Sequence, residues 1–477
     1  MLHPPMTSAW VLLILLVGAI LALSFALRSR ARTAQGFFAA HARIPWFING
    51  FALAGAYLSA AFFLGICGLI AFWGYDGFLL AIAGLAGWLV ATLLFAEPLN
   101  GRGRFTFADA LDGPGGSSSL RLAAGTSTLV LAILCLLPQL LCAGAIVHSI
   151  AGLPFFVGVI AAGLLIILIV AAAGMPSITW VQFFQGAFLL LAGVALTVAL
   201  FSRGLSAKPP AAAPRIVDGA AFDRLLAPDD KVLPTTGPWI GHYFVRVQHP
   251  DGHITTWKYV GMARFIRGYP ASLFTQCQTL TRLPSGQTLV NGLPQTPQND
   301  LHPVGFIDTL PINPATPTTL KPSTGPLGPL SLLATLQDST LGLPPSQSLT
   351  AADGSLTTIY FPDAIPVPDL MAPGLDPTLF PDYHTTLPGR LNFLSLMLAL
   401  LGGTVTLPHL LIRHYAVKDP AAARKSSGLA LVLIALGALL ALSLGLGAMA
   451  SMQLDPARPI LAATLFAKSF GSLPFAL

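Results

Sequence analysis

Eight long apolar segments constrain this chain more than any other feature of its sequence. The hydrocarbon core of a bilayer is about 30 Å thick, and a helix of roughly 20 apolar residues crosses it without leaving backbone groups unsatisfied. Hydrophobic residues make up 54% of the 477 residues and charged residues 9%, whereas soluble domains carry roughly a quarter charged residues. We therefore expect an all-α polytopic membrane protein. The eight segments are 9–27, 46–72, 78–96, 126–148, 155–173, 179–201, 391–412 and 428–450.

Positive charges indicate which side of the membrane each connection faces. Cytoplasmic connections are enriched in Lys and Arg, and the basic clusters at 28–43, 102–121 and 413–425 follow the first, third and seventh segments. These clusters fall on one side, which puts the N-terminus and the stretch 204–390 on the other side. The net charge of +6 is explained by this topology, and we expect no nucleic-acid partner.

Hydrophobicity falls sharply between Ser202 and Gly389, which predicts an inserted extracytoplasmic domain. Asp251-Gly252 separates two alternating runs and supplies the turn residues of a β-hairpin, and Asp353-Gly354 opens a second such run. The Pro-rich stretch 301–329 is typical of an irregular linker. We expect this insertion to be mainly irregular or β structure.

Two of the apolar segments contain interruptions that point to a binding site. Because Asp, Glu, Lys and Arg are absent from the deep parts of the segments, dipoles and hydroxyls must hold any ligand there. A broken membrane helix directs free amides at an anion and free carbonyls at a cation. The interruptions lie at Ser59–Gly65 and Gly402–Pro408. Their small residues also suit close helix packing, so packing and ligand contact both stay open.

Several other polar side chains have a structural and a functional interpretation. Gln139 lies within the fourth segment, where its amide could bond a neighbouring backbone group or a ligand, and His409 could be a structural group or a proton carrier. His242, His249 and His253 flank a turn without the Cys or acidic spacing of a metal site. We expect no metal there. The segments also lack a nucleophile, acid pair or metal cluster at a plausible depth, so we expect no enzyme.

Short motifs along the chain together resemble one family. In order, these motifs are Ile44–Gly50, Leu58–Gly65, Gly74–Gly77, Arg104–Asp109, Thr179–Gln182 and Leu407–His409 with Arg413 and Arg424–Ser426. They resemble the solute:sodium symporter family, most closely its bacterial acetate-permease and monocarboxylate branch. The resemblance covers most of the membrane portion.

The resemblance implies an inverted-repeat core of five plus five helices that couples Na⁺ entry to uptake of a small solute by alternating access. A short carboxylate would suit free helix amides, with Na⁺ as the coupling ion and no cofactor. The implied organisation is a leading helix with a cytoplasmic loop (1–45), a first five-helix repeat (46–203), the insertion (204–390), the first two helices of a second repeat (391–453) and a tail entering the next helix (454–477).

The resemblance also assigns roles to individual residues. It implies cation-binding oxygens at Ser59, Ala60 and Phe63. It implies substrate contacts at Tyr57, Gln139, Thr404 and Thr406, and helix breaks at Gly65, Gly402, Gly403 and Pro408.

The chain departs from the family pattern in three places. Ala56 stands where the family has Asp, Phe62 stands where a Ser is usual, and the chain stops at Leu477 before the helix that supplies the hydroxyl half of the family's Na⁺ site. We therefore expect a truncated core that a small membrane subunit or a separate polypeptide would complete.

The expected function is cation-coupled symport of acetate or another short monocarboxylate in the bacterial inner membrane, with the lipid bilayer and the carboxylate solute as partners. Two alternatives stay open. One is a truncated or non-transporting membrane protein, and the other is a sensor whose extracytoplasmic domain binds a ligand.

Overall fold

The computed structural model describes residues 6–27, 33–102, 105–110, 118–207, 216–266, 269–296, 299–309, 323–361, 363–376 and 379–470. Within these ranges the chain forms two compact units. The helical unit comprises Met1–Ser202, Leu370–Ala448 and Pro459–Leu477, and the β unit comprises Arg203–Asp369 and Met449–Arg458. Arg28, Arg30, Arg32 and Arg104 of the expected cytoplasmic clusters lie outside the described residues.

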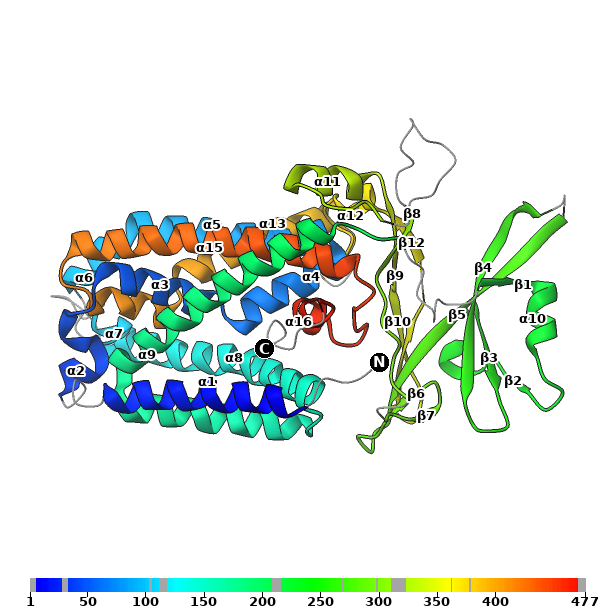
Figure 1. Ribbon diagram of the computed structural model, residues 1–477, viewed down its shortest axis with the longest axis horizontal. Coiled ribbons are helices and arrows are strands. Elements are labelled where there is room, and N and C mark those ends of the chain that lie inside the picture. The colour runs from blue at the N-terminus through cyan, green and yellow to red at the C-terminus, as the bar shows by residue number, and fades with distance from the viewer. Residues whose placement is uncertain are drawn as a thin grey trace. The chain divides into compact units, whose positions relative to one another are not determined.

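The helical unit contains nearly all of the long helices (Figure 1). Its α-helices are α1 (Met6–Ala26), α2 (Ala34–Ala39), α3 (Trp46–Tyr57), α4 (Gly65–Trp73), α5 (Tyr75–Leu94), α6 (Ala96–Arg102), α7 (Phe107–Ala110), α8 (Ser118–Ala151), α9 (Phe155–Arg203), α13 (Leu387–Val405), α14 (Pro408–Leu411), α15 (Pro420–Met449) and α16 (Ala462–Lys468). Shorter turns of other helix types are η2 (Ala40–Ala42), η3 (Ala60–Leu64), η5 (Ile412–Ala416) and η6 (Pro459–Leu461). The region 454–477, expected as a tail, thus includes η6 and α16.

Five helical stretches of the described chain are long and apolar enough to cross a membrane. They are Tyr75–Leu94, Ser118–His148, Gly174–Arg203, Leu387–Ala416 and Pro420–Met449. The bent pair Trp46–Tyr57 and Phe62–Trp73 makes a sixth candidate, and Val17–Ala26 and Phe155–Ala171 are shorter apolar helices. The expected multi-pass helical membrane protein is therefore confirmed. The label α9 covers both expected segments, 155–173 and 179–201, but the backbone at Gly174 is non-helical (φ 54°, ψ −138°), so two helices, Phe155–Ala171 and Gly174–Arg203, meet there just before Pro176.

Close helix packing surrounds α3. A Cβ placed on Gly55 would lie 2.2 Å from the Gln182 carbonyl oxygen of α9 and 2.9 Å from the Gly186 nitrogen, so any side chain here would force the two backbones apart. On α15, a Cβ at Gly437 would lie 2.6 Å from the Leu58 side chain. Small residues are what allow membrane helices to approach this closely. They hold α3 between α9 and α15.

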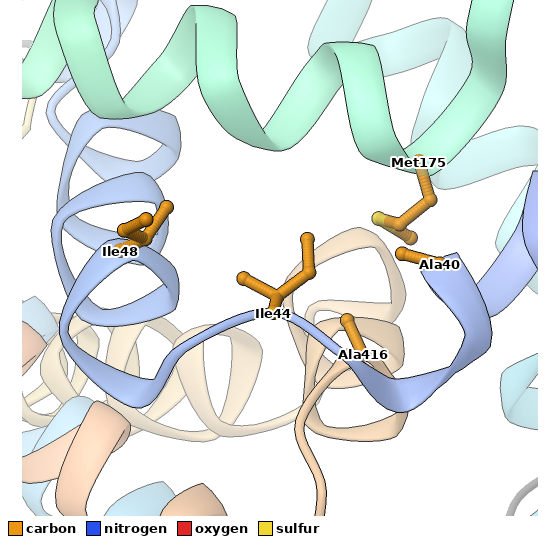
Figure 2. Close-up of a cluster of buried hydrophobic side chains, with 5 residues drawn as sticks. All are labelled: Ala40, Ile44, Ile48, Met175 and Ala416. Carbon is orange, nitrogen blue, oxygen red and sulfur yellow. The ribbon is translucent and has the colours of Figure 1, made fainter. Parts of the chain in front are cut away.

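A buried apolar cluster joins the connection before α3 to other parts of the helical unit (Figure 2). The Ile44 N–H also donates to the Ala416 carbonyl oxygen (3.0 Å), which fixes this connection against η5. The cluster thus anchors the start of α3 on elements distant in sequence. Its members are Ala40, Ile44, Ile48, Met175 and Ala416.

The β unit is built on two antiparallel sheets. The larger follows the order β10-β11-β5-β4-β3-β2, with β1 and β6 also pairing with β5 and β7 pairing with β6, and the smaller follows β12-β9-β8. The strands are β1 (Ile216–Asp218), β2 (Lys231–Leu233), β3 (Phe244–Gln248), β4 (Ile254–Ile266), β5 (Tyr269–Arg282), β6 (Thr288–Val290), β7 (Leu293–Pro294), β8 (Phe306–Thr309), β9 (Thr340–Leu343), β10 (Ser346–Thr350), β11 (Leu356–Tyr360) and β12 (Asp363–Pro366). Three short α-helices, α10 (Gly219–Leu225), α11 (Pro329–Gln337) and α12 (Val367–Leu370), and the 3₁₀ turn η4 (Gly237–Trp239) accompany them.

Both hairpins predicted from Asp-Gly pairs are confirmed. β3 pairs with β4 from Gln248↔Ile254 onward, and Gly252 in the connecting turn has φ +85°. β10 pairs with β11 around the second turn. The expected β structure of the insertion is confirmed and is extensive, because a nine-stranded sheet and a three-stranded sheet lie within it. The Pro-rich stretch also contributes β8, although 310–322 lie outside the described residues.

The β unit has a core of its own. Cys277 on β5 packs with Phe244 of β3 and Ile359 of β11, and its burial raises the pKa of the thiol to about 12. The segment Met449–Arg458 belongs to this unit by its contacts, since Val304 and Leu454 exchange two backbone hydrogen bonds of 2.9 and 3.1 Å.

Candidate functional site

The first helix break lies between α3 and α4. α3 ends at Tyr57, the Ser59 backbone is extended (φ −70°, ψ 169°), and η3 follows as a π-type turn. The Ser59 hydroxyl caps this turn by accepting from the Phe62 N–H at 3.4 Å. The helix axes on the two sides differ by 54°. A single extended residue with a capping hydroxyl therefore redirects the span.

Ser59 is also bonded to a different helix. The Gln139 Nε2 of α8 donates to the Ser59 Oγ at 3.0 Å. This contact brings together one residue expected to bind the cation and one expected to bind the substrate. An interhelical hydrogen bond in a membrane contributes about 0.6 kcal/mol on average, enough to orient the amide without holding it permanently.

The other residues expected to bind the cation lie in the same turn. The Phe63 N–H donates to the Ser59 carbonyl oxygen at 2.7 Å, and the Gly65 N–H donates to the Ala60 carbonyl oxygen. Phe63 is buried and Ala60 is partly buried. A carbonyl oxygen has two lone pairs, so the oxygens of Ser59 and Ala60 each keep capacity for a cation. Gly65 opens α4 and has no heavy atom within 4 Å of the position a Cβ would take.

Tyr57 connects the first break to α5 and α13. Its ring packs on Phe62 (centroids 4.4 Å apart) and against Trp88 at a right angle (5.7 Å). Its hydroxyl lies close enough to the Thr404 side chain to interact with it electrostatically. A Cβ at Gly84 would lie 2.2 Å from that hydroxyl oxygen. Two expected substrate residues, Tyr57 and Thr404, thus meet beside a space that a glycine keeps open.

The second helix break lies between α13 and α14. α13 ends at Val405, and α14 begins at Pro408. Proline has no N–H to continue a helix and disfavours helical backbone in the residue before it, and Leu407 is indeed extended (φ −62°, ψ 106°). Gly402 and Gly403, expected at the break, lie within the last turns of α13.

Thr406 stands apart from the other expected substrate residues. Its hydroxyl donates to the Gly402 carbonyl oxygen at 3.0 Å, with the Gly403 carbonyl oxygen at 3.3 Å, and its side chain is exposed. The hydroxyl therefore satisfies the end of its own helix. No contact in the described part of the chain joins it to Tyr57, Gln139 or Thr404.

The sequence did not single out two further polar groups of the helical unit. Trp88 and Thr92 are buried one helical turn apart on α5, and neither the Trp88 Nε1 nor the Thr92 Oγ1 has a hydrogen-bond partner within the described ranges. Buried polar groups without partners are uncommon. Their i, i+4 spacing inside an apolar segment is the signal that could have identified them.

Asp76, in the motif Gly74–Gly77, organises a connection of the helical unit. Its carboxylate is fully buried and accepts from the Gly374 N–H (2.7 Å) and the Asp376 N–H (2.8 Å). Backbone N–H bonds to a carboxylate are charge-assisted and among the stronger hydrogen bonds in proteins. This acidic residue therefore has a structural role that holds 374–376 at the start of α5.

Two of the three histidines that flank the turn, His249 and His242, have ordinary hydrogen-bond partners, and the His253 ring stacks on His249. His249 Nδ1 lies 2.8 Å from an Asp230 carboxylate oxygen and its Nε2 lies 3.0 Å from the Thr255 hydroxyl, while His242 contacts Gln347 at 2.8 Å. The Ala227 backbone N–H, followed by His249, lowers the pKa of Asp230. Across the described chain, no three His, Cys, Asp or Glu side chains gather closely enough to hold a metal ion.

The broken spans and their cross-helix contacts define a polytopic membrane protein with a polar break inside its helical unit. The sodium:solute symporter family model matches residues 37–218 and 371–468. The chain belongs to this family, as its motifs predicted.

One relative and one solved structure illustrate the similarity. The Bacillus subtilis (strain 168) protein named as an uncharacterized symporter, YwcA, is 32% identical over 196 residues, which are 41% of this chain and 38% of that protein. The chain thus spans less than two fifths of the length of that relative. A Na⁺-coupled sialic acid symporter, solved in a substrate-bound outward-open state, is 11% identical with a TM-score of 0.38 over 98% of this chain and 79% of its own. A likeness at this level supports no statement about geometry.

Proposed function

We propose that this chain carries out Na⁺-coupled symport of a small monocarboxylate, with acetate as the first candidate, by alternating access across a bacterial inner membrane. Membership of the sodium:solute symporter family supports the ion and the class of reaction. The observation that carries the proposal is the hydrogen bond from Gln139 to Ser59 at the first break. It links an amide donor suited to a carboxylate with a hydroxyl and carbonyls suited to Na⁺.

In this proposal, different groups at the two helix breaks bind Na⁺ and the carboxylate. Ser59, Ala60 and Phe63 supply oxygens to Na⁺ from the turn between α3 and α4. Gln139, with the hydroxyls of Tyr57, Thr404 and Thr406, faces the carboxylate. Hydroxyl and amide donors can orient a carboxylate at this site without a buried charge. We also propose that the two breaks occupy equivalent places in an inverted repeat, with the N-terminus and the β unit outside.

The test is uptake by the full chain reconstituted into liposomes. An inward Na⁺ gradient should drive accumulation of radiolabelled acetate, and a Na⁺ ionophore should abolish it. Replacing Na⁺ by K⁺ on both sides is the matched control, because it leaves the protein and the lipid unchanged. Absence of Na⁺-dependent uptake of acetate, propionate and lactate would contradict the proposed substrate class. Binding of an acid without uptake would favour the sensor.

A further inference from the structure

Arg413 is buried in a way that the sequence did not predict. It was expected among the exposed cytoplasmic charges with Lys418, Arg424 and Lys425, yet it is only 3% exposed. It lies on η5, which follows the second helix break and the short helix α14. Taking a guanidinium out of water is unfavourable unless opposite charge or several acceptors surround it.

The described residues give the Arg413 side chain little compensation. Its Nη1 donates to the Thr179 hydroxyl oxygen at 3.4 Å, a long hydrogen bond, and Thr179 in turn donates to the Met175 carbonyl oxygen at 2.8 Å. No carboxylate of the described chain lies within 4.0 Å of it. One neutral hydroxyl is a weak partner for a buried cation.

The nearby carboxylates are already engaged elsewhere. Glu97 on α6, an element that packs on η5, pairs with Arg424 at 3.1 Å. Asp109 accepts from the backbone N–H groups of Phe105 and Thr106 (3.1 and 2.8 Å), and Asp419 caps the start of α15 at the Ala422 N–H (2.7 Å). Among the described residues, Arg413 therefore has no carboxylate as an ion-pair partner.

Other groups hold Arg413 in place and add no negative charge. Asn49, fully buried on α3, donates to the Arg413 carbonyl oxygen (3.4 Å) and to the Ser426 hydroxyl (3.1 Å). His409 on α14 interacts electrostatically with Arg413. An arginine held by its backbone and without a carboxylate partner among the described residues can bind a carboxylate with two parallel hydrogen bonds.

We infer that Arg413 binds the carboxylate of the transported monocarboxylate at a second station, distinct from the break between α3 and α4. This inference rests on the proposed function for the identity of the ligand. The first site holds the solute with neutral donors, and the second uses a full charge. Movement of the substrate past α14 would then be favoured by the guanidinium.

The experiment compares acetate binding and uptake by the full chain and three variants. Arg413→Gln removes the charge. Arg413→Lys keeps the charge but loses the two parallel N–H donors of the guanidinium. Arg424→Gln is the matched control, because that arginine is 67% exposed and pairs with Glu97. Arg413→Gln should raise the KM for acetate by about 10-fold or more, Arg413→Lys by less, and Arg424→Gln by less than about twofold. An unchanged KM in Arg413→Gln, with less folded protein, would show a structural role and overturn the inference.

A second measurement does not depend on transport or on the stability of one variant. Acetate, and not its uncharged isostere acetamide, should raise the Tm of the wild-type chain in nanodiscs, and Arg413→Gln should lose most of this shift and Arg413→Lys part of it. Equal protection by inorganic phosphate, or equal protection of Arg413→Lys by acetate, would overturn the assignment. If acetate raises the Tm of the wild-type chain in a way that depends on Arg413, but no Na⁺-driven uptake is seen, the carboxylate site is supported. The proposed transport function would then be contradicted.

Discussion

The two helix breaks differ in where their polar side chains are bonded. At the first break, Ser59 caps its own turn and also accepts from Gln139 on α8. At the second break, Thr406 bonds only to carbonyl oxygens of the helix that it ends, among the contacts of the described residues. The first break is thus tied to a neighbouring helix, and the second is self-contained.

This difference shows that a broken span is not by itself a binding site. Both breaks expose the ends of helices, whose free amides and carbonyls attract ions. The first combines that property with a side-chain hydrogen bond from another helix, and such a convergence of groups is what can select a ligand. The hydroxyl of the second break bonds within its own helix, and we propose that this break acts as a hinge.

The largest effect should come from the packing around the first break. Gly55→Ala would put a Cβ 2.2 Å from the Gln182 carbonyl oxygen, whereas Gly402→Ala, near the second break, would meet no heavy atom within 4 Å. Overpacking of this kind costs about 1–3 kcal/mol. Thermal unfolding of the purified protein should therefore show a clear loss of stability for Gly55→Ala only.

The matched pair separates packing from helix propensity. Both substitutions gain up to about 1 kcal/mol of intrinsic helix propensity, so any difference between them reports the space around each glycine. Equal stabilities for the two variants would mean that α3 and α9 do not pack this closely.

The sequence predicted where the helix breaks lie better than it predicted which side chains of other helices bond to them. Ser59 next to small residues and Pro408 at the end of an apolar segment are local signals, because capping hydroxyls and missing N–H groups act within one turn. The link between Ser59 and Gln139 spans 80 residues. One amide in an apolar segment does not reveal which neighbouring helix it will face. For this reason the sequence predicted that the Gln139 amide bonds either a neighbouring backbone group or a ligand.

The burial of Arg413 and the extent of the β unit were missed for a related reason. A basic residue at the end of an apolar segment usually lies in the cytoplasmic headgroup region, whereas here η5 packs against α2, η2, α3 and α6 and Arg413 is buried. In the insertion, β5 pairs with four other strands, of which β1 and β11 lie far from it in sequence. Pairings between distant strands leave little trace in local alternation of residues.

A smaller effect is expected for the hydrogen bond that distinguishes the first break. In a double-mutant cycle of Ser59→Ala and Gln139→Ala, the coupling energy should be about 0.6 kcal/mol and at most about 1.7 kcal/mol. The same cycle between Gln139→Ala and Thr406→Val is the control, and it should be additive because no described contact joins these residues. Unfolding in mixed micelles would measure both cycles. A coupling near zero in the first, or a comparable coupling in the second, would remove the distinction between the breaks.

The smallest change in stability is expected for Thr406→Val. Its exposed hydroxyl bonds back to Gly402 and Gly403, so an isosteric valine should alter the free energy of unfolding by less than about 0.5 kcal/mol. If the hydroxyl leaves its own helix to face the carboxylate, as we propose, the KM for acetate should rise by about two- to tenfold, the value of one hydrogen bond. Thr406→Ser keeps the hydroxyl and should restore the wild-type KM. A KM that is unchanged in Thr406→Val would exclude Thr406 from the substrate site and leave the second break as a hinge alone.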